Sequence, residues 1–147
     1  MPMIDLTFVR GSLHDEALRT LADDLVTVLL RAEGVPDTAF MRDNTVVYLH
    51  AIDPAAQLVG GRQTGEPRFR VDVTAFAGAL SKEGKEQLAA DVHAAVCVAA
   101  DIEPTGPCAY HVWTLIHDAP EGNWAGAGKV VYRQHVQDLT TKNSENS

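Results

Sequence analysis

Hydrophobic and polar residues alternate along residues 4–9 and again along residues 69–76, a two-residue period typical of a strand with one buried face. After each strand the period lengthens to that of an amphipathic helix. The apolar positions are Leu18, Leu21, Leu25, Val28 and Leu29 in the first helix and Leu88, Val92, Val96 and Ala99 in the second. A further strand-like run follows each helix, at 45–51 and 110–117. The pattern therefore predicts strand, helix, strand twice over.

Local signals mark where the two predicted helices begin and end. Ser12 with Asp15 three residues later resembles a capping box, and Ser81 is placed to cap the second helix. Gly34 followed by Pro36 predicts the end of the first helix.

The chain also matches itself when it is shifted by 67 residues. Identical pairs include Asp5 and Asp72, Thr7 and Thr74, Leu21 and Leu88, His50 and His117, and Gly61 and Gly128. We therefore predict an α+β domain built from a duplicated β-α-β unit, with a four-stranded mixed sheet and two helices on one face. The repeat units are 2–66 and 67–132, followed by a C-terminal tail, 133–147, which we expect to fray from Lys142 onward.

The face of the sheet without helices is expected to carry Val47, Leu49, Val112 and Thr114. These residues are too apolar to remain exposed, so we expect other copies of the chain to cover them.

Composition narrows the possible classes of protein. A chain of 147 residues with 46% hydrophobic and 22% charged residues matches one soluble globular domain. The net charge of −8 argues against nucleic acid or an anionic membrane surface as a partner, and no apolar stretch is long enough to span a membrane. Cys97 and Cys108 do not have the spacing of a redox pair or zinc site, and His111 and His117 lie too far apart along a strand to share an ion. We predict a cytoplasmic protein without a metal.

Two further features of the sequence suggest a family. Pro2 directly follows Met1, and a Gly- and Ala-rich segment around Trp124 lies near the end of the second repeat. Together with the duplicated unit, these features resemble the tautomerase superfamily over residues 2–132. The fused two-unit members are the most similar, namely the cis-3-chloroacrylic acid dehalogenase, malonate semialdehyde decarboxylase and macrophage migration inhibitory factor groups. The resemblance implies a homotrimer that needs no cofactor, a catalytic N-terminal proline, here Pro2, and an active-site aromatic on the last hairpin, here Trp124.

The chemistry expected of Pro2 follows from its amine. A free α-amine has an ordinary pKa of about 7.7–8, far below that of lysine, so a terminal proline can act as a base near neutral pH. This requires removal of Met1, because an acylated proline nitrogen is an amide without a basic lone pair. The 67-residue register places Phe69 where the first half has Pro2, so we expect one site per chain.

The arginines depart from the pattern of the family. Ser12 stands where single-unit tautomerases carry an arginine, and the loop 77–83 lacks the paired arginines of the dehalogenase and decarboxylase groups. This argues against direct transfer of either of those activities, because a carboxylate substrate needs charge-assisted donors. Arg42 is the substitute we favour for binding the substrate carboxylate, and Arg10 is a second candidate.

We predict a cofactor-independent keto–enol tautomerase or isomerase in which Pro2 is the general base and the substrate is a small α-keto acid or its enol. Two alternatives remain open. One is a proline-dependent hydratase, dehalogenase or decarboxylase acting on a small three-carbon acid. The other is a catalytically silent trimeric binding protein.

Overall fold

A four-stranded sheet forms the centre of the computed structural model, which describes residues 2–145. Its strand order is β2-β1-β5-β6, where β1 and β2 are parallel, β1 and β5 antiparallel, and β5 and β6 parallel. The strands are β1 (Met3–Val9), β2 (Val46–Ile52), β5 (Phe69–Phe76) and β6 (Val112–Ala119). The predicted mixed sheet is confirmed.

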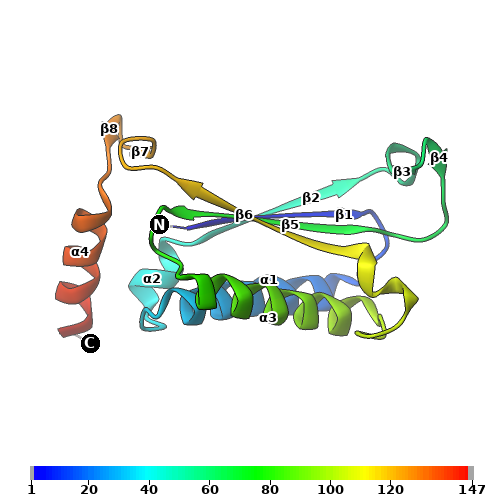
Figure 1. Cartoon of the computed structure of the whole chain (residues 1–147), viewed down its shortest axis with the longest axis horizontal. Coiled ribbons are helices and arrows are strands. Elements are labelled where there is room, and N and C mark those ends of the chain that lie inside the picture. The colour runs from blue at the N-terminus through cyan, green and yellow to red at the C-terminus, as the bar shows by residue number, and fades with distance from the viewer. Residues whose placement is uncertain (1, 146–147) are drawn as a thin grey trace.

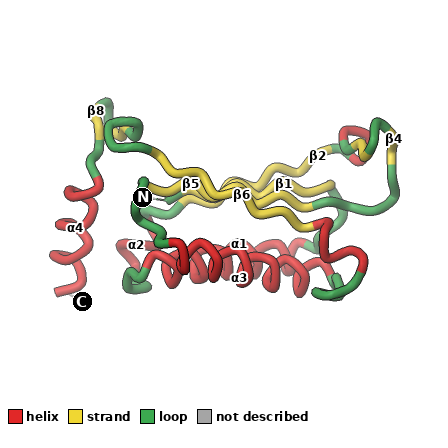
Figure 2. Tube along the Cα trace, in the orientation of Figure 1, coloured by secondary structure: helices red, strands yellow, loops and turns green. Residues whose placement is uncertain are grey.

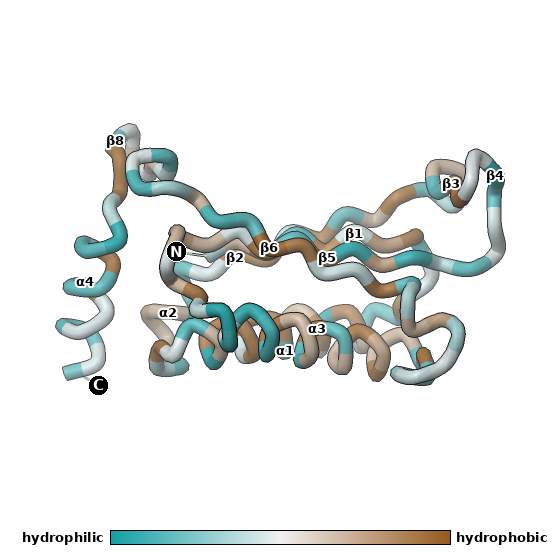
Figure 3. Tube along the Cα trace, in the orientation of Figure 1, coloured by the Kyte–Doolittle hydropathy of each residue, from teal (hydrophilic) through white to brown (hydrophobic). Residues whose placement is uncertain are grey.

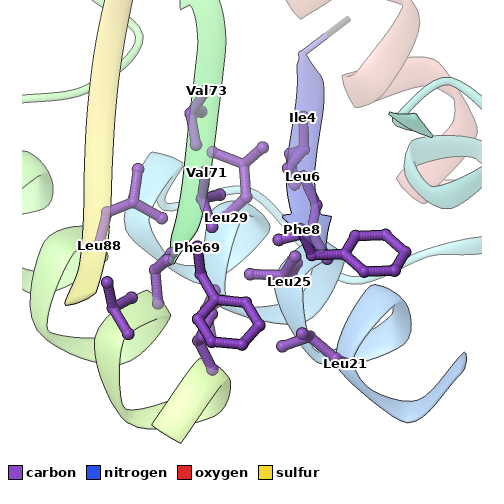
Figure 4. Packing of buried hydrophobic residues seen from close by; sticks show 14 of the residues in the cluster. Ile4, Leu6, Phe8, Leu21, Leu25, Leu29, Phe69, Val71, Val73 and Leu88 are labelled. Atoms are coloured by element: carbon purple, nitrogen blue, oxygen red, sulfur yellow. The ribbon is translucent and has the colours of Figure 1, made fainter. Parts of the chain in front are cut away.

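Two long helices, α1 (Asp15–Glu33) and α3 (Lys82–Ala100), lie side by side on one face of this sheet (Figures 1 and 2). The core lies between the two layers. Its side chains include Ile4, Leu6 and Phe8 of β1, Phe69, Val71 and Val73 of β5, Leu21, Leu25 and Leu29 of α1, and Leu88 of α3 (Figure 4). Each fully buried side chain of this kind stabilises the fold by about 1.5–3 kcal/mol.

The ends of the helices agree with the sequence signals except at the start of α1. Ser81 caps α3 as expected, because its hydroxyl accepts a hydrogen bond from the backbone N–H of Gly84 at 3.0 Å. The predicted capping box at Ser12 is wrong. The Ser12 hydroxyl donates to the carbonyl of Val9 at 2.6 Å and so closes the turn after β1, and His14 precedes α1 without a side-chain cap.

The duplicated unit extends to a short hairpin after each parallel strand. β3 (Leu58–Val59) and β4 (Arg62–Gln63) form the first hairpin, and β7 (Ala125–Gly126) and β8 (Lys129–Val130) form the second. The two hairpins lie at opposite ends of the sheet (Figure 1). Three short helical segments complete the repeats: α2 (Ala39–Asp43), η1 (Pro54–Ala56) and η2 (Pro107–His111).

The C-terminal tail forms a helix, α4 (Arg133–Glu145), so the fraying expected from Lys142 onward is wrong for the residues up to 145. This helix is mainly hydrophilic (Figure 3) and stands beside α2, at the end of the molecule where β1 begins (Figure 1). The Thr140 hydroxyl lies 3.4 Å from the Met41 sulfur and ties the two helices together. No helix within residues 2–145 is long and apolar enough to cross a membrane.

The prediction of which residues lie on the bare face of the sheet is wrong, because these residues lie on the face that packs against the helices. Val47 pairs with Ile4, Val112 pairs with Phe69, and both valines pack into the core beneath the helices. Both alternating sets of β2 and β6 are apolar, so the pattern alone did not distinguish the two faces, and a one-residue shift exchanges them. The alternate set, which includes Tyr48 and Trp113, is exposed.

Candidate functional site

A pocket of about 400 Å³ opens beside Pro2, which is itself buried. The carbonyl of Pro2 accepts a hydrogen bond from the backbone N–H of Val46 at 3.4 Å, and this bond fixes the entry into β1. Met1 lies outside the described residues, so its removal stays a prediction.

The topology of the sheet explains which residues meet at Pro2. Because β1 and β5 are antiparallel, the start of β1 lies beside the end of β5, and Phe76 and Ala79 reach the pocket. The last turn of α1 contributes Glu33. The helix α4 closes the remaining side with Arg133, Val136, Gln137, Thr140 and Thr141.

Arg133 brings a positive charge to this pocket. Among the described residues, no carboxylate forms an ion pair with its guanidinium. The Nη1 atom would lie only 2.9 Å from a Cβ atom added to Gly78, so the guanidinium rests directly against this glycine. An unpaired arginine in a pocket can bind the carboxylate of a ligand.

Glu33 brings an ionisable carboxyl group to the same pocket. Burial raises the pKa of Glu33, and the positive charges of the chain terminus and of Arg133 act in the opposite direction. A carboxyl group with a raised pKa can give or take a proton closer to neutral pH than an ordinary glutamate.

Trp124 lies next to the pocket rather than on its surface. Its ring packs against the ring of Phe76, with centroids 5.2 Å apart, and Phe76 lines the pocket. The aromatic expected on the last hairpin therefore supports the pocket wall.

Arg42, expected to bind substrate, is not among the residues that line the Pro2 pocket. Its Nε and Nη2 donate to both carboxylate oxygens of Asp37 at 2.6 and 2.7 Å. Nη1 donates to Asp23 at 2.8 Å, and Nη2 also reaches Thr27. The hydrogen bonds from Arg42 lower the pKa of Asp37, and Asp37 in turn raises the pKa of Arg42. Arg42 thus joins α1 to the loop before α2.

Arg10 lies at the wrong end of its strand for this pocket. It follows the last residue of β1, whereas Pro2 precedes the first, and its backbone N–H donates to Ile52 at 2.8 Å. Eight residue steps along β1 separate Pro2 from Arg10, which is about 26 Å at roughly 3.3 Å per residue. Arg10, the second candidate for binding the substrate carboxylate, therefore does not reach the Pro2 pocket of its own chain.

Sequence reasoning missed Arg133 and Glu33. A signal for the first exists, because Arg133, Val136 and Thr140 follow one another at helical spacing and so share a face of α4. Glu33 carries no such signal, since it comes to Pro2 only through the packing of α1 beneath the sheet.

A separate group of possible metal ligands lies elsewhere in the chain. The ligand atoms of Glu66, Cys108 and His111 all lie within 4.8 Å of one another, with His111 Nε2 at 3.7 Å from Glu66 Oε2. Cysteine, histidine and glutamate are ligands that zinc accepts. The sequence did not predict this group, because Glu66 is distant along the chain from the other two residues.

Comparison with known proteins places the fold. No protein-family model and no curated protein matches the sequence. Solved structures do match. The structure of N1, a member of the cis-3-chloroacrylic acid dehalogenase family, is 19% identical, with a TM-score of 0.72 over 97% of this chain and 99% of that chain. A fused 4-OT described as a wild-type symmetric trimer is 18% identical, with a TM-score of 0.72 over 91% of this chain and 98% of that chain.

The macrophage migration inhibitory factor of Toxoplasma gondii is 14% identical, with a TM-score of 0.67 over 88% of this chain and 99% of that chain. At these identities the likeness establishes the fold, and the chain has the tautomerase superfamily fold in its duplicated form. The matching structures come from the fused 4-OT, cis-3-chloroacrylic acid dehalogenase and macrophage migration inhibitory factor groups, so the resemblance seen in the sequence is confirmed at the level of the fold.

Proposed function

We propose that this protein is a cofactor-independent keto–enol tautomerase of small α-keto acids, with the amine of Pro2 as general base after removal of Met1. The observation that carries the proposal is the buried Pro2 in a pocket that also holds the unpaired Arg133. Arg133 binds the substrate carboxylate in this proposal, in place of the arginines that the family pattern supplies elsewhere.

The proposed reaction needs one proton carrier. The neutral Pro2 amine takes the hydroxyl proton of the enol, and the resulting ammonium gives a proton to the adjacent carbon as the carbonyl forms. An amine on Pro2 is buried and shares its pocket with the cationic Arg133, and both conditions favour the neutral form. Glu33, the acidic group of the pocket, opposes this less than an ordinary glutamate would, because burial raises its own pKa. The pKa of the Pro2 amine should then lie below the ordinary range of about 7.7–8, so the base is available at neutral pH.

The test starts with protein whose Met1 removal has been verified by intact mass. We expect this protein to convert the enol of phenylpyruvate to the keto form. Pro2→Ala should lower kcat/KM by about a hundredfold or more, because a primary terminal amine without the proline ring replaces the aligned base. Pro36→Ala, at an exposed proline outside the pocket, should not change it. Processed wild-type protein without activity would contradict the proposal and favour the catalytically silent trimer.

A covalent label tests the position of the amine independently. Pt0534, a structure 18% identical with a TM-score of 0.73, is described as inactivated by 2-oxo-3-pentynoate, an α-keto acid. This reagent should add to the present protein once per chain, and peptide mapping should place the adduct on Pro2. Labelling of Lys82 or Lys142 at the same rate would argue against a reactive terminal amine.

Glu33 favours a second candidate, hydration of an unsaturated carboxylate. In this reaction protonated Pro2 donates to one carbon while a carboxylate activates water to attack the other, and Glu33 is the carboxyl group that shares the pocket. Glu33→Gln should then abolish hydration of a small acetylenic or olefinic acid. A pure tautomerase would keep its phenylpyruvate activity in the same variant.

A further inference from the structure

A second pocket, of about 470 Å³, lies at the opposite end of the sheet from Pro2. The shift of 67 residues that relates the two repeats also relates the two pockets. Phe69 begins β5 and lines the second pocket, as Pro2 precedes β1 and lines the first. The hairpin β3–β4, which is the repeat counterpart of β7–β8, supplies Leu58 and Val59 to this pocket (Figure 1).

Arg68 is the unusual residue of this second pocket. Its Nε atom is buried without a hydrogen-bond partner, and within residues 2–145 its guanidinium forms no ion pair. Its backbone N–H donates to the Gln57 side chain at 2.8 Å, which holds the residue in place. The chain has 20 acidic and 12 basic residues, so the lack of a partner does not come from a shortage of carboxylates.

The neighbouring charged groups already have partners of their own. Arg70 pairs with Asp72 at 2.8 Å. The carboxylate of Glu66 lies 3.7 Å from His111, and the Glu66 side chain is 66% exposed. Arg68 is therefore the one lining cation, among the described residues, that is left to bind an anion.

The remaining walls are largely apolar. Ile52, Leu58, Val59 and Phe69 contribute aliphatic and aromatic surface. The indole N–H of Trp113 already donates to the carbonyl of Tyr110 at 2.9 Å, so Trp113 offers the pocket aromatic surface rather than a free donor.

We propose that this second pocket binds a small carboxylate with an apolar or aromatic body, whose carboxylate pairs with Arg68. A buried donor without a partner is costly, and a carboxylate would satisfy it with charge-assisted hydrogen bonds. The ligand binds without reacting, because Phe69 lies in the middle of the chain. Its nitrogen is an amide, whereas the first pocket has the terminal amine of the proline. The duplicated fold thus has one site for chemistry and one for binding.

The two tryptophans allow each pocket to be followed separately. Trp113 lines the second pocket, whereas Trp124 packs on Phe76 of the first. In the full-length assembled protein labelled with 5-fluorotryptophan, the two fluorine signals can be assigned with Trp113→Phe and Trp124→Phe. Titration with benzoate as the probe should shift the Trp113 signal in a saturable manner.

Variants of Arg68 test the role of its guanidinium. Arg68→Gln should weaken the benzoate affinity seen at Trp113 about tenfold or more and leave any response at Trp124 unchanged. Arg68→Lys keeps the charge without the planar fork and should bind with intermediate affinity, and it serves if the glutamine variant does not fold. Arg62→Gln is the matched control, because Arg62 lies on β4 of the hairpin that supplies Leu58 and Val59 but outside the pocket, and this variant should bind as the wild type does.

Four outcomes would overturn the proposal. The first is a response to benzoate at Trp124 alone, and the second is no response at either tryptophan. The third is full affinity at Trp113 in Arg68→Gln. Loss of the native oligomer in Arg68→Gln, seen by light scattering, would also overturn it, since Arg68 would then pair with a second copy of the chain rather than with a ligand.

Discussion

Single residues show where the two repeats have diverged while their backbone has not. Four pairs of positions related by the 67-residue shift all have positive φ: Gly11 and Gly78, Gly34 and Asp101, Gly60 and Ala127, and Gly61 and Gly128. A positive φ costs little for glycine and about 1–2 kcal/mol for most other residues. The second repeat therefore holds strain at Asp101 and Ala127 that the first repeat avoids.

Replacing these two residues by glycine should stabilise the protein. We expect a gain in the free energy of unfolding of about 1 kcal/mol for Ala127→Gly and about 0.5 kcal/mol for Asp101→Gly, because aspartate tolerates this conformation better than alanine. Urea denaturation measures both. Ala89→Gly, inside α3, is the control and should destabilise by about 1 kcal/mol. If Ala127→Gly also destabilised the protein by about 1 kcal/mol, no strain would be stored at Ala127.

Two arginines allow the substrate-binding assignment to be tested. Arg133→Gln should lower kcat/KM for phenylpyruvate about ten- to a hundredfold, mainly through KM, because the carboxylate loses its charge-assisted partner. Arg42→Gln should lower the melting temperature, since Asp37 and Asp23 lose their shared partner, but should leave KM unchanged. A rise in KM for Arg42→Gln alone would return the role to Arg42.

The raised pKa of Glu33 predicts a dependence of stability on pH. The folded protein holds the Glu33 proton to a higher pH than the unfolded chain, so this group's contribution to stability is present at low pH. The contribution is lost as pH rises above the unfolded value of about 4.3 and through the raised folded value. Glu33→Gln should therefore be more stable than the wild type at pH 7, and this advantage should disappear at pH 4. Urea titrations at both pH values measure the difference, and an advantage equal at both would contradict the raised pKa.

Among the elements, α4 connects fold and site most directly. None of its described residues is buried, yet five of them line the Pro2 pocket. The helix therefore contributes little to the hydrophobic core, and its main contribution is one wall of the Pro2 pocket. Its sequence is mainly hydrophilic, and its place in the pocket became clear only from its packing against α2.

The contact between α1 and α3 depends on one small residue. A Cβ atom at Gly84 would lie 2.8 Å from the backbone carbonyl oxygen of Ala32. Gly84→Ala gains about 1 kcal/mol in helix propensity, but forcing the helices apart costs more, and we expect a net loss of about 1–3 kcal/mol. Chemical denaturation measures it. Gly65→Ala, in open space, should change stability by less than about 0.5 kcal/mol, and equal effects at both sites would exclude a special contact at Gly84.

At the scale of the whole molecule, the uncovered face of the sheet is arranged for association. Two repeat-related pairs lie on it, His50 with Asp5 at 2.6 Å and His117 with Asp72 at 2.8 Å. Exposed apolar side chains such as Leu115 surround them. Each carboxylate already pairs with a histidine, and the second oxygen of Asp72 lies 2.8 Å from Arg70 Nε. Another copy can therefore cover this face without leaving the two carboxylates unpaired.

A charge on this face should therefore prevent assembly. We expect the wild type to have three times the 15.9 kDa mass of one chain by light scattering, in keeping with the trimer named for a fused 4-OT of the same fold. Leu115→Arg should shift the mass toward the monomer. Val98→Arg, at an exposed valine on α3, should not. Dissociation by both variants, or by neither, would show that the trimer uses other surfaces.

The sequence by itself determined the duplicated β-α-β fold and the position of Pro2 directly before the first strand. These features depend on local periodicity and on a repeat in which β1 and β5, or α1 and α3, occupy matching positions. Only the tertiary structure decided which charged groups accompany Pro2. The antiparallel pairing of β1 with β5 and the docking of α4 bring Arg133 and Glu33 to the proline, whereas Arg42 meets Asp37 and Asp23 first. Periodicity shows which side of an element is buried, but the side chains that meet across elements are set by packing that no local pattern contains.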